Sequence, residues 1–371
     1  MKRLLINTSN IHVGGGVQVA VSFIDELTRM SNLPPGLVVW ASDLVNKNLI
    51  NQGSNLCALP NYEVVNSNGI RLLLSSLSLR LRSFDTVFTL FGPLYLLNSP
   101  FVNITGFAQP SIIYPQHDLH ETMSFPKRWF NKVKFSIQSI FFRKADYLVV
   151  ELEQVRAALL RQKIGFESNI YVIRNCLSSL YASPKLWQET SVPQKDVDIK
   201  LGYLGRNYLH KNTKIFPEVI RILSRNYGIN AAIFVTFTAK EWSLCSDDFK
   251  KLVVNVGPLL VSQCPSFYTQ MDAIIFPSLL ECFSATPLEA MAMRKPIFAS
   301  DRPFNREICC EYANYFEPLS PDSAAKEIAN FYFSGGRRPD ELSSASTHAF
   351  RFSSAQQRAH EYLSLLMTDL K

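Results

Sequence analysis

The 371-residue sequence lacks the features that mark several protein classes. No stretch approaches the roughly 20 consecutive apolar residues of a membrane-spanning helix, and residues 1–7 do not resemble a secretory signal. The seven cysteines are odd in number and include no C-x-x-C pair, which argues against a disulfide scaffold and a Cys/His zinc site. We therefore expect reduced thiols, a cytoplasmic location, no metal and no other cofactor.

A dinucleotide fingerprint is also missing. The glycine run Gly14-Gly15-Gly16 would need a further glycine at position 19, which is Val. This disfavours an oxidoreductase. The positive charge is uneven: residues 1–197 hold 19 Lys and Arg against 13 Asp and Glu, a balance of +6 out of the total of +7. Such an excess favours an anionic partner.

The remaining composition is that of a globular protein, with 47% apolar and 19% charged residues. Short apolar runs alternate with segments of helical periodicity, which predicts an α/β protein with two Rossmann-like, doubly wound domains facing a central cleft. The predicted strands cover 3–7, 36–41, 86–91, 102–107 and 147–150, then 200–205, 231–237, 252–256, 273–277 and 296–300.

The domain boundaries follow from the change in composition after Cys176. We expect a first domain over 1–176, a Ser-, Pro- and Gln-rich linker over 177–197 and a second domain over 198–352. Residues 353–371 have helical periodicity and are expected to pack back at the domain junction.

The most specific motif is the strand, loop and helix of residues 276–292, which carries two glutamates eight positions apart. Thr286 and Glu289 are expected at the N-cap and third position of the helix. The backbone N–H groups of Phe283, Ser284, Ala285 and Thr286 would then face a diphosphate or sugar hydroxyls. The alternative is that Glu289 only completes a capping box with Thr286.

This stretch resembles the E-x7-E signature of the retaining GT4 (group 1) glycosyltransferases, which have the GT-B fold. The resemblance implies that Glu289 binds the ribose of a nucleotide-diphosphate sugar and that Glu281 lies near the transferred sugar. Family members commonly have glycine where Cys282, Ser284 and Arg294 stand here.

The loop after the first strand of the second domain is similar to the family's G-R-x4-K element. The resemblance implies that Arg206 and Lys211 neutralise the donor diphosphate, a task that a metal-free enzyme gives to fixed cations. The alternative is a pair of surface cations at a strand end.

Further donor contacts are expected on the same grounds. Gly15 and Gly16 form a loop before the helix 17–30, a ready anion site. Leu259 and Leu260, after the strand 252–256, match the position of the family's base-binding wall, although an ordinary turn is the alternative. Gln109 stands where the family often has a histidine, and His117 is the second choice.

The segment 127–144 combines aromatic residues with six cations and no acidic residue. It could lie on an anionic membrane or be a core-facing helix with a solvated basic face. Its cations are Lys127, Arg128, Lys132, Lys134, Arg143 and Lys144.

Taken together, the sequence predicts a metal-independent hexosyltransferase that uses a UDP- or GDP-sugar. The acceptor is expected to be a lipid-linked glycan of O-antigen or capsule type, reached at the cytoplasmic face of the inner membrane, and no nucleic acid is expected as a partner. Two alternatives are a GT-B sugar-nucleotide epimerase and a non-catalytic nucleotide-sugar-binding subunit.

Overall fold

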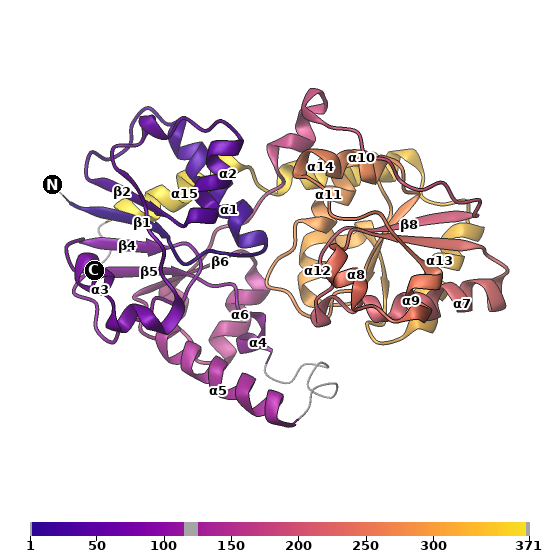
Figure 1. Ribbon diagram of the computed structural model, residues 1–371, viewed down its shortest axis with the longest axis horizontal. Helices are drawn as coiled ribbons and strands as arrows, with labels where there is room; N and C mark the ends of the chain where they lie inside the picture. Colours follow the sequence, from indigo (N-terminus) through magenta and orange to yellow (C-terminus); the bar gives the residue numbers. More distant parts are fainter. Residues whose placement is uncertain (1, 115–124, 369–371) are drawn as a thin grey trace. The chain divides into compact units, whose positions relative to one another are not determined.

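A computed structural model of the protein describes residues 2–114 and 125–368 (Figure 1). The chain forms two compact units. The first contains the described residues of 2–176 together with 353–368, and the second contains 177–352. Each unit is built around one fully parallel sheet, which confirms the prediction of two doubly wound α/β units.

The sheet of the first unit has seven strands in the order β3-β2-β1-β4-β5-β6-β7. Its inner strands are buried on both faces, as parallel strands covered by helices must be. The short edge strands β3 and β7 had no clear sequence signal. The strands are β1 Leu4–Thr8, β2 Leu37–Ala41, β3 Tyr62–Val64, β4 Thr86–Thr89, β5 Val102–Gly106, β6 Tyr147–Val150 and β7 Ile170–Val172.

Helices cover this sheet, and α15 near the C-terminus is one of them (Figure 1). The Tyr362 ring of α15 lies 5.0 Å from the rings of both Phe23 and Phe88. The helices are α1 Gly15–Thr28, α2 Asp43–Asn51, α3 Leu77–Leu81, α4 Pro110–Ile113, α5 Phe125–Phe142, α6 Glu153–Arg161 and α15 Ala355–Met367.

A buried polar network also holds α15 in the first unit. Arg358 is 1% exposed and donates to the Ser22 hydroxyl at 2.9 Å and to Asn175 Oδ1. Asn175 in turn donates to Glu151 at 2.7 Å. Burial raises the pKa of Glu151 to about 7, although the charge of Arg358 and the bond from Asn175 oppose the rise.

The sheet of the second unit has six strands in the order β10-β9-β8-β11-β12-β13. The strands are β8 Ile199–Tyr203, β9 Ala231–Val235, β10 Val253–Asn255, β11 Ala273–Phe276, β12 Ile297–Ser300 and β13 Ala313–Phe316. The helices are α7 Phe216–Tyr227, α8 Ala239–Ser243, α9 Asp247–Leu252, α10 Cys264–Thr269, α11 Thr286–Ala292, α12 Pro303–Cys309, α13 Pro321–Phe333 and α14 Pro339–Phe352.

The segment 177–197, expected as a linker, runs along the second unit. Gln188 N donates to Ser262 O at 2.8 Å, and Thr190 N donates to Ser266 Oγ at 3.1 Å. Short 3₁₀ turns at Ser179–Ala182 and Pro184–Leu186 give it local structure.

The two sheets share one topological feature. The strand order reverses between β1 and β4 in the first unit and between β8 and β11 in the second. Ligands of open α/β sheets bind beyond the carboxyl ends of the strands at such a reversal. Among the described helices, none is long and apolar enough to cross a membrane.

Candidate functional site

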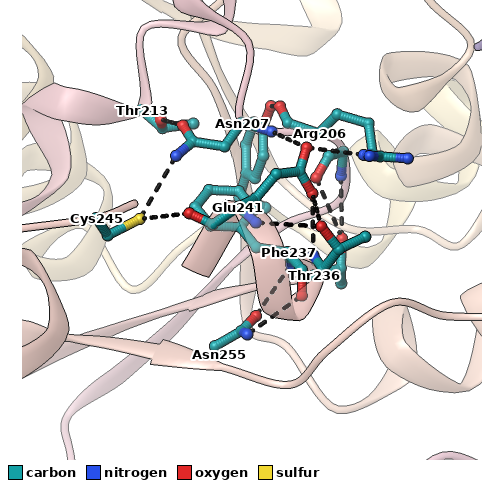
Figure 2. Close-up of polar contacts among 11 residues, drawn as sticks. Arg206, Asn207, Thr213, Thr236, Phe237, Glu241, Cys245 and Asn255 are labelled. Carbon is teal, nitrogen blue, oxygen red and sulfur yellow. Dashed lines mark hydrogen bonds and ion pairs between the residues drawn. The ribbon is translucent and has the colours of Figure 1, made fainter. Parts of the chain in front are cut away.

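The loop after β8 carries Arg206, which is fixed by one carboxylate. Its Nε lies 2.8 Å from Oε1 of Glu241, and the same oxygen accepts from the backbone N–H of Asn207 at 3.1 Å (Figure 2). Arg206 is 53% exposed, whereas Glu241 is 13% exposed. The ion pair uses Nε and therefore leaves the two terminal nitrogens of the guanidinium outside it.

Glu241 can anchor the arginine because it is itself held by a capping box. At the start of α8, Glu241 N donates to Thr238 Oγ1 at 3.3 Å, and Thr238 N donates to Glu241 Oε2 at 2.9 Å. Burial opposes ionisation of Glu241, but the bonds from Arg206, Thr238 and Asn207 outweigh it and lower its pKa to about 2. Arg206 is thus an exposed but oriented cation.

Lys211 and Glu281 form a second ion pair. Lys211 Nζ lies 2.5 Å from Glu281 Oε1, and the two side chains are 15% and 12% exposed. Ser278 Oγ donates to the same oxygen at 2.6 Å. Glu281 is therefore not an exposed loop carboxylate, and Lys211 is not a free surface cation. Burial lowers the pKa of the neighbouring His210.

Backbone bonds join the loop after β8 to the loop after β11. Leu279 N donates to His210 O at 2.7 Å, and Thr286 Oγ1 lies 3.5 Å from Leu204 O. The structure thus brings Arg206, Lys211 and Glu281 to the carboxyl ends of the two strands at the reversal of strand order.

The start of α11 differs from the prediction. Its N-cap is Ala285, so Thr286 is the first helical residue and the prediction was wrong by one position. Ala285 has helical dihedral angles (φ −74°, ψ −26°), and Pro287 fits the first turn because the first N–H groups of a helix have no intrahelical partner. Glu289 consequently stands one position beyond the place that a capping box requires.

The carboxylate of Glu289 binds tyrosine instead. Tyr268 donates its hydroxyl to Glu289 Oε2 at 2.8 Å, and the buried hydroxyl of Tyr181, which makes no hydrogen bond within the described residues, lies near the same carboxylate. Burial raises the pKa of Glu289, and the interactions with Tyr268 and Tyr181 oppose the rise. The capping-box alternative for Glu289 is therefore wrong.

Sequence reasoning missed both tyrosines. Tyr181 lies in the segment expected as a linker, and Tyr268 lies on the short helix α10, outside every motif. Their rings are 6.2 Å apart. No local signal could have found them, because only the packing of three distant segments brings them to Glu289.

The other expected donor contacts in the second unit lie as follows. Phe283 and Ser284 precede α11, and the Ser284 side chain is buried. Leu259 and Leu260 lie in the loop after β10, where Leu259 is half-buried and Leu260 is 62% exposed.

In the first unit, Gly15 and Gly16 are the first two residues of α1, not a loop before it. Only Gly14, the N-cap, has the left-handed φ of +72° that favours glycine. Gln109 is the N-cap residue of α4 and makes no capping bond with its side chain. His117 lies outside the described residues.

No group of three or more His, Cys, Asp or Glu within 2–114 and 125–368 is arranged to hold a metal. The chain does contain one Asp-x-Asp triplet, Asp196-Val197-Asp198. It precedes β8, at the amino end of the sheet, where Asp198 Oδ2 accepts from Asn230 N at 2.7 Å. The triplet is therefore at the opposite end of β8 from Arg206.

Helix α5 carries the basic and aromatic segment at the periphery of the first unit (Figure 1). Only Gln138, Phe141 and Phe142 of its described side chains are buried. Exposed apolar residues recur at three- and four-residue spacing along the other side, which makes one continuous stripe. These residues are Trp129, Phe130, Val133, Ile137 and Ile140.

The cations of this segment divide into two groups. Arg143 donates to the backbone carbonyls of Lys163 and Gln162 at 3.2 Å each, and Lys144 donates to Leu97 O at 2.9 Å. These two cations thus hold the end of α5 to the first unit. The remaining four are exposed: Lys127, Arg128, Lys132 and Lys134.

Comparison with known proteins agrees with the geometry. Residues 190–346 match the family model of the glycosyl transferases group 1. A curated relative, the O-antigen chain mannosyltransferase RfbU of Salmonella typhimurium, is 24% identical over 151 residues, which are 40% of this chain and 42% of that protein. The match thus spans less than half of the relative's length.

Solved structures resemble the chain over nearly its whole length. A glycosyltransferase of Rickettsia africae gives a TM-score of 0.68 at 17% identity and covers 98% of both chains. Anabaena HepE, solved in complex with UDP-glucose, gives 0.67 at 14% identity and covers 98% of this chain and 100% of that one. The chain therefore has the GT-B fold, and most of its second unit matches the glycosyl transferases group 1.

Proposed function

We propose that this protein is a metal-independent, retaining glycosyltransferase that moves a sugar from a UDP- or GDP-sugar to a hydroxyl of a lipid-linked glycan. One observation carries the proposal: two loops at the strand reversal of the second unit, joined by backbone bonds, carry Arg206, Lys211 and Glu281. Lys211 is paired with Glu281, and Arg206 is paired with Glu241 of α8. Fixed cations are what a departing nucleoside diphosphate needs when no metal neutralises it.

The diphosphate would bind to Arg206 and Lys211. Arg206 offers its two terminal guanidinium nitrogens, because Glu241 holds only Nε and fixes the orientation of the group. Lys211 would share its ammonium between Glu281 and a phosphate oxygen. Charge-assisted hydrogen bonds of this kind are short and about twice as strong as neutral ones. The backbone of residues 283–286 would complete the contact.

The nucleoside would bind along α11 and the loop after β10. Glu289 has one oxygen bonded to Tyr268, and its carboxylate can accept further bonds from ribose hydroxyls. Leu259 and Leu260 would line the base. Glu281 would lie near the transferred sugar, where Lys211 and Ser278 fix its position.

Helix α5 supports a membrane-bound acceptor. With 3.6 residues per turn, Lys127 and Lys134 flank one edge of its apolar stripe, and Arg128 and Lys132 flank the other. An apolar stripe between two rows of cations is the pattern of a helix that lies in an anionic membrane interface. Each cation near such a surface contributes about 1 kcal/mol, so four suffice for reversible binding.

A vesicle sedimentation assay tests this part of the proposal. The parent protein should pellet with anionic vesicles at low salt, and a variant with Lys127, Arg128, Lys132 and Lys134 changed to Ser should stay in the supernatant. The matched control removes four exposed lysines of the second unit and should pellet like the parent; these are Lys185, Lys195, Lys240 and Lys326. Equal sedimentation of both variants would refute the role of α5.

The relation to RfbU, an O-antigen chain mannosyltransferase, supports a role in the synthesis of a surface polysaccharide such as O-antigen or capsule at the cytoplasmic face of the inner membrane. The activity test combines the purified protein, a panel of UDP- and GDP-sugars and lipid-linked acceptors in the presence of EDTA. We expect a longer glycan from one donor, with the anomeric configuration of that donor by NMR. A C2-epimerised nucleotide sugar, or an inverted product, would contradict the proposal.

A further inference from the structure

The loop after β9 lies between the two loops that the proposed function assigns to the donor, because β9 lies between β8 and β10 in the sheet. The register pairs Tyr203 of β8 with Val235 of β9, and Val235 with Asn255 of β10, so these residues form one row across the sheet. Arg206 follows this row after β8, and Leu259 follows it after β10. The pairing of the strands thus stops before either donor loop begins, so other contacts must hold the two loops at a fixed distance.

Thr236, the first residue after β9, binds the loop after β8. Its Oγ1 accepts from Gly205 N at 3.1 Å and lies 3.5 Å from Gly205 O. The Thr236 side chain is buried, and Gly205 directly precedes Arg206 in the chain. Glu241 of α8, the helix that follows the same loop, accepts from Arg206 Nε and from Asn207 N (Figure 2). The segment after β9 therefore binds the chain on both sides of the arginine.

Asn255, the last residue of β10, binds the loop after β9 from its other side. Its Oδ1 accepts from Phe237 N at 2.9 Å, and its Nδ2 donates to Phe237 O at 3.2 Å (Figure 2). The same Oδ1 also accepts from Gly257 N at 3.2 Å. Gly257 has a φ of +90°, a left-handed value that favours glycine. One side-chain amide thus joins the residue after Thr236 to the turn that leads to Leu259.

These bonds connect the two parts of the donor site through a single intervening loop. A nucleoside diphosphate would contact both parts at once, and linking two groups raises affinity only when their subsites lie at the matching distance. We propose that Thr236 and Asn255 are positioning residues that set the distance between the base-binding and diphosphate-binding parts of the site. The inference rests on the proposed function, which assigns the base to Leu259 and the diphosphate to Arg206.

A purely structural role for the two side chains predicts a different pattern of affinities. If Thr236 or Asn255 only supported its own loop, its loss would disturb one part of the site and would weaken the matching fragment of the donor as much as the whole. If these residues set a distance, each part should still bind its own fragment. Only a ligand that spans both parts should then lose affinity, because the linked groups no longer reach both subsites in their best geometry.

Calorimetry with the whole nucleotide and with its fragments tests the proposal, and NMR titration measures fragments that bind too weakly for calorimetry. The probes are UDP and GDP, the nucleosides uridine and guanosine, and inorganic pyrophosphate. Thr236→Val keeps the shape of the side chain and removes its hydroxyl, and Asn255→Leu keeps its size and removes its amide. We expect each variant to bind the nucleoside diphosphate about tenfold more weakly, and the nucleoside and pyrophosphate less than about twofold more weakly.

Two further variants control for stability. Thr236→Ser restores the hydroxyl and should restore the affinity of the parent protein. Asn314 on β13 is half-buried like Asn255 and donates Nδ2 to Ile297 O at 3.2 Å, so Asn314→Leu should lower the free energy of unfolding but leave all affinities unchanged. If Asn255→Leu does not fold, Thr236→Val and its rescue by Thr236→Ser decide the question.

The outcomes separate this inference from the proposed function. An unchanged affinity for the nucleoside diphosphate in the folded variants overturns the positioning role, and so does an equal loss for a nucleoside or for pyrophosphate. The same loss in Asn314→Leu would show that affinity follows stability alone and would also overturn it. A parent protein that binds neither UDP nor GDP refutes the proposed function together with this inference, whereas nucleotide binding that parent and variants share refutes the positioning role alone.

Discussion

Replacing Lys211 with methionine separates its contribution to folding stability from its expected contribution to binding the diphosphate. The substitution keeps most of the side chain's apolar length, removes the charge and leaves Glu281 without its cation. The two side chains are 15% and 12% exposed, and breaking a fully buried ion pair costs about 3–5 kcal/mol. Because Ser278 still donates to Glu281, we expect the free energy of unfolding to fall by about 2 kcal/mol. The additional substitution Glu281→Gln should recover much of this loss.

Ligand affinity should respond differently. A charge-assisted contact with a phosphate contributes about 1.5–3 kcal/mol. Its loss in Lys211→Met should raise the dissociation constant for the nucleoside diphosphate roughly 10- to 150-fold. Uridine and guanosine carry no diphosphate, so their affinity should not change. The double variant should bind UDP or GDP as weakly as Lys211→Met although its stability is recovered.

Isothermal titration calorimetry with UDP, GDP, uridine and guanosine, combined with urea unfolding, measures both quantities. Lys214→Met is the matched control, because Lys214 is exposed three residues away. An equal loss for nucleoside and nucleotide would show a general disturbance of the site. An unchanged diphosphate affinity, or the same loss in Lys214→Met, would refute the assignment of Lys211.

Three further predictions concern other parts of the protein. Tyr268→Phe removes a bond to Glu289 and should weaken uridine and UDP binding about equally, by about 1 kcal/mol in calorimetry; an effect on UDP alone would contradict a ribose contact. The pKa of Glu151 is raised from 4.5 to about 7 in the folded state, so the folded state binds the proton more tightly and the free energy of unfolding should fall as pH rises from about 4.5 to 7, by about 3 kcal/mol. Glu151→Gln should abolish this decline in urea unfolding, whereas the exposed-site control Glu167→Gln should retain it. Glycosyl transfer should survive EDTA, and a rate that EDTA abolishes and Mg²⁺ or Mn²⁺ restores would refute the metal-free mechanism.

Much of the fold follows from local sequence. Inner parallel strands are continuous apolar runs, so β5, β6 and β12 lie within one residue of their predicted bounds. The edge strands β3, β7 and β13 escaped prediction because each is a short, partly exposed strand without a clear apolar run.

The candidate site was predictable only in part. Motif spacing identified Arg206, Lys211, Glu281 and Glu289, but it could not give their partners. Glu241 sits 35 residues after Arg206 and is recognisable only as a capping residue until the fold places it beside the guanidinium. The capping-box pattern Thr-x-x-Glu occurs twice, at Thr238 and at Thr286. The second does not form a capping box, because α11 starts one residue earlier than expected.

The basic segment illustrates another limit. Periodicity indicated an amphipathic helix, but it could not tell which side faces the core. In the structure the buried side holds Gln138 with two phenylalanines, and most of the apolar stripe is exposed. Two of the six cations, Arg143 and Lys144, donate to backbone carbonyls. The sequence could not show this, because the carbonyls belong to the residues that follow α6 and to the loop after β4.

A crystal structure of the chain with its bound nucleotide-diphosphate sugar tests the central claim most directly. We predict phosphate oxygens within hydrogen-bond distance of both Arg206 and Lys211, ribose hydroxyls against Glu289, and the transferred sugar beside Glu281. A nucleotide bound elsewhere, or a diphosphate held by a metal ion and not by these two cations, would contradict the account.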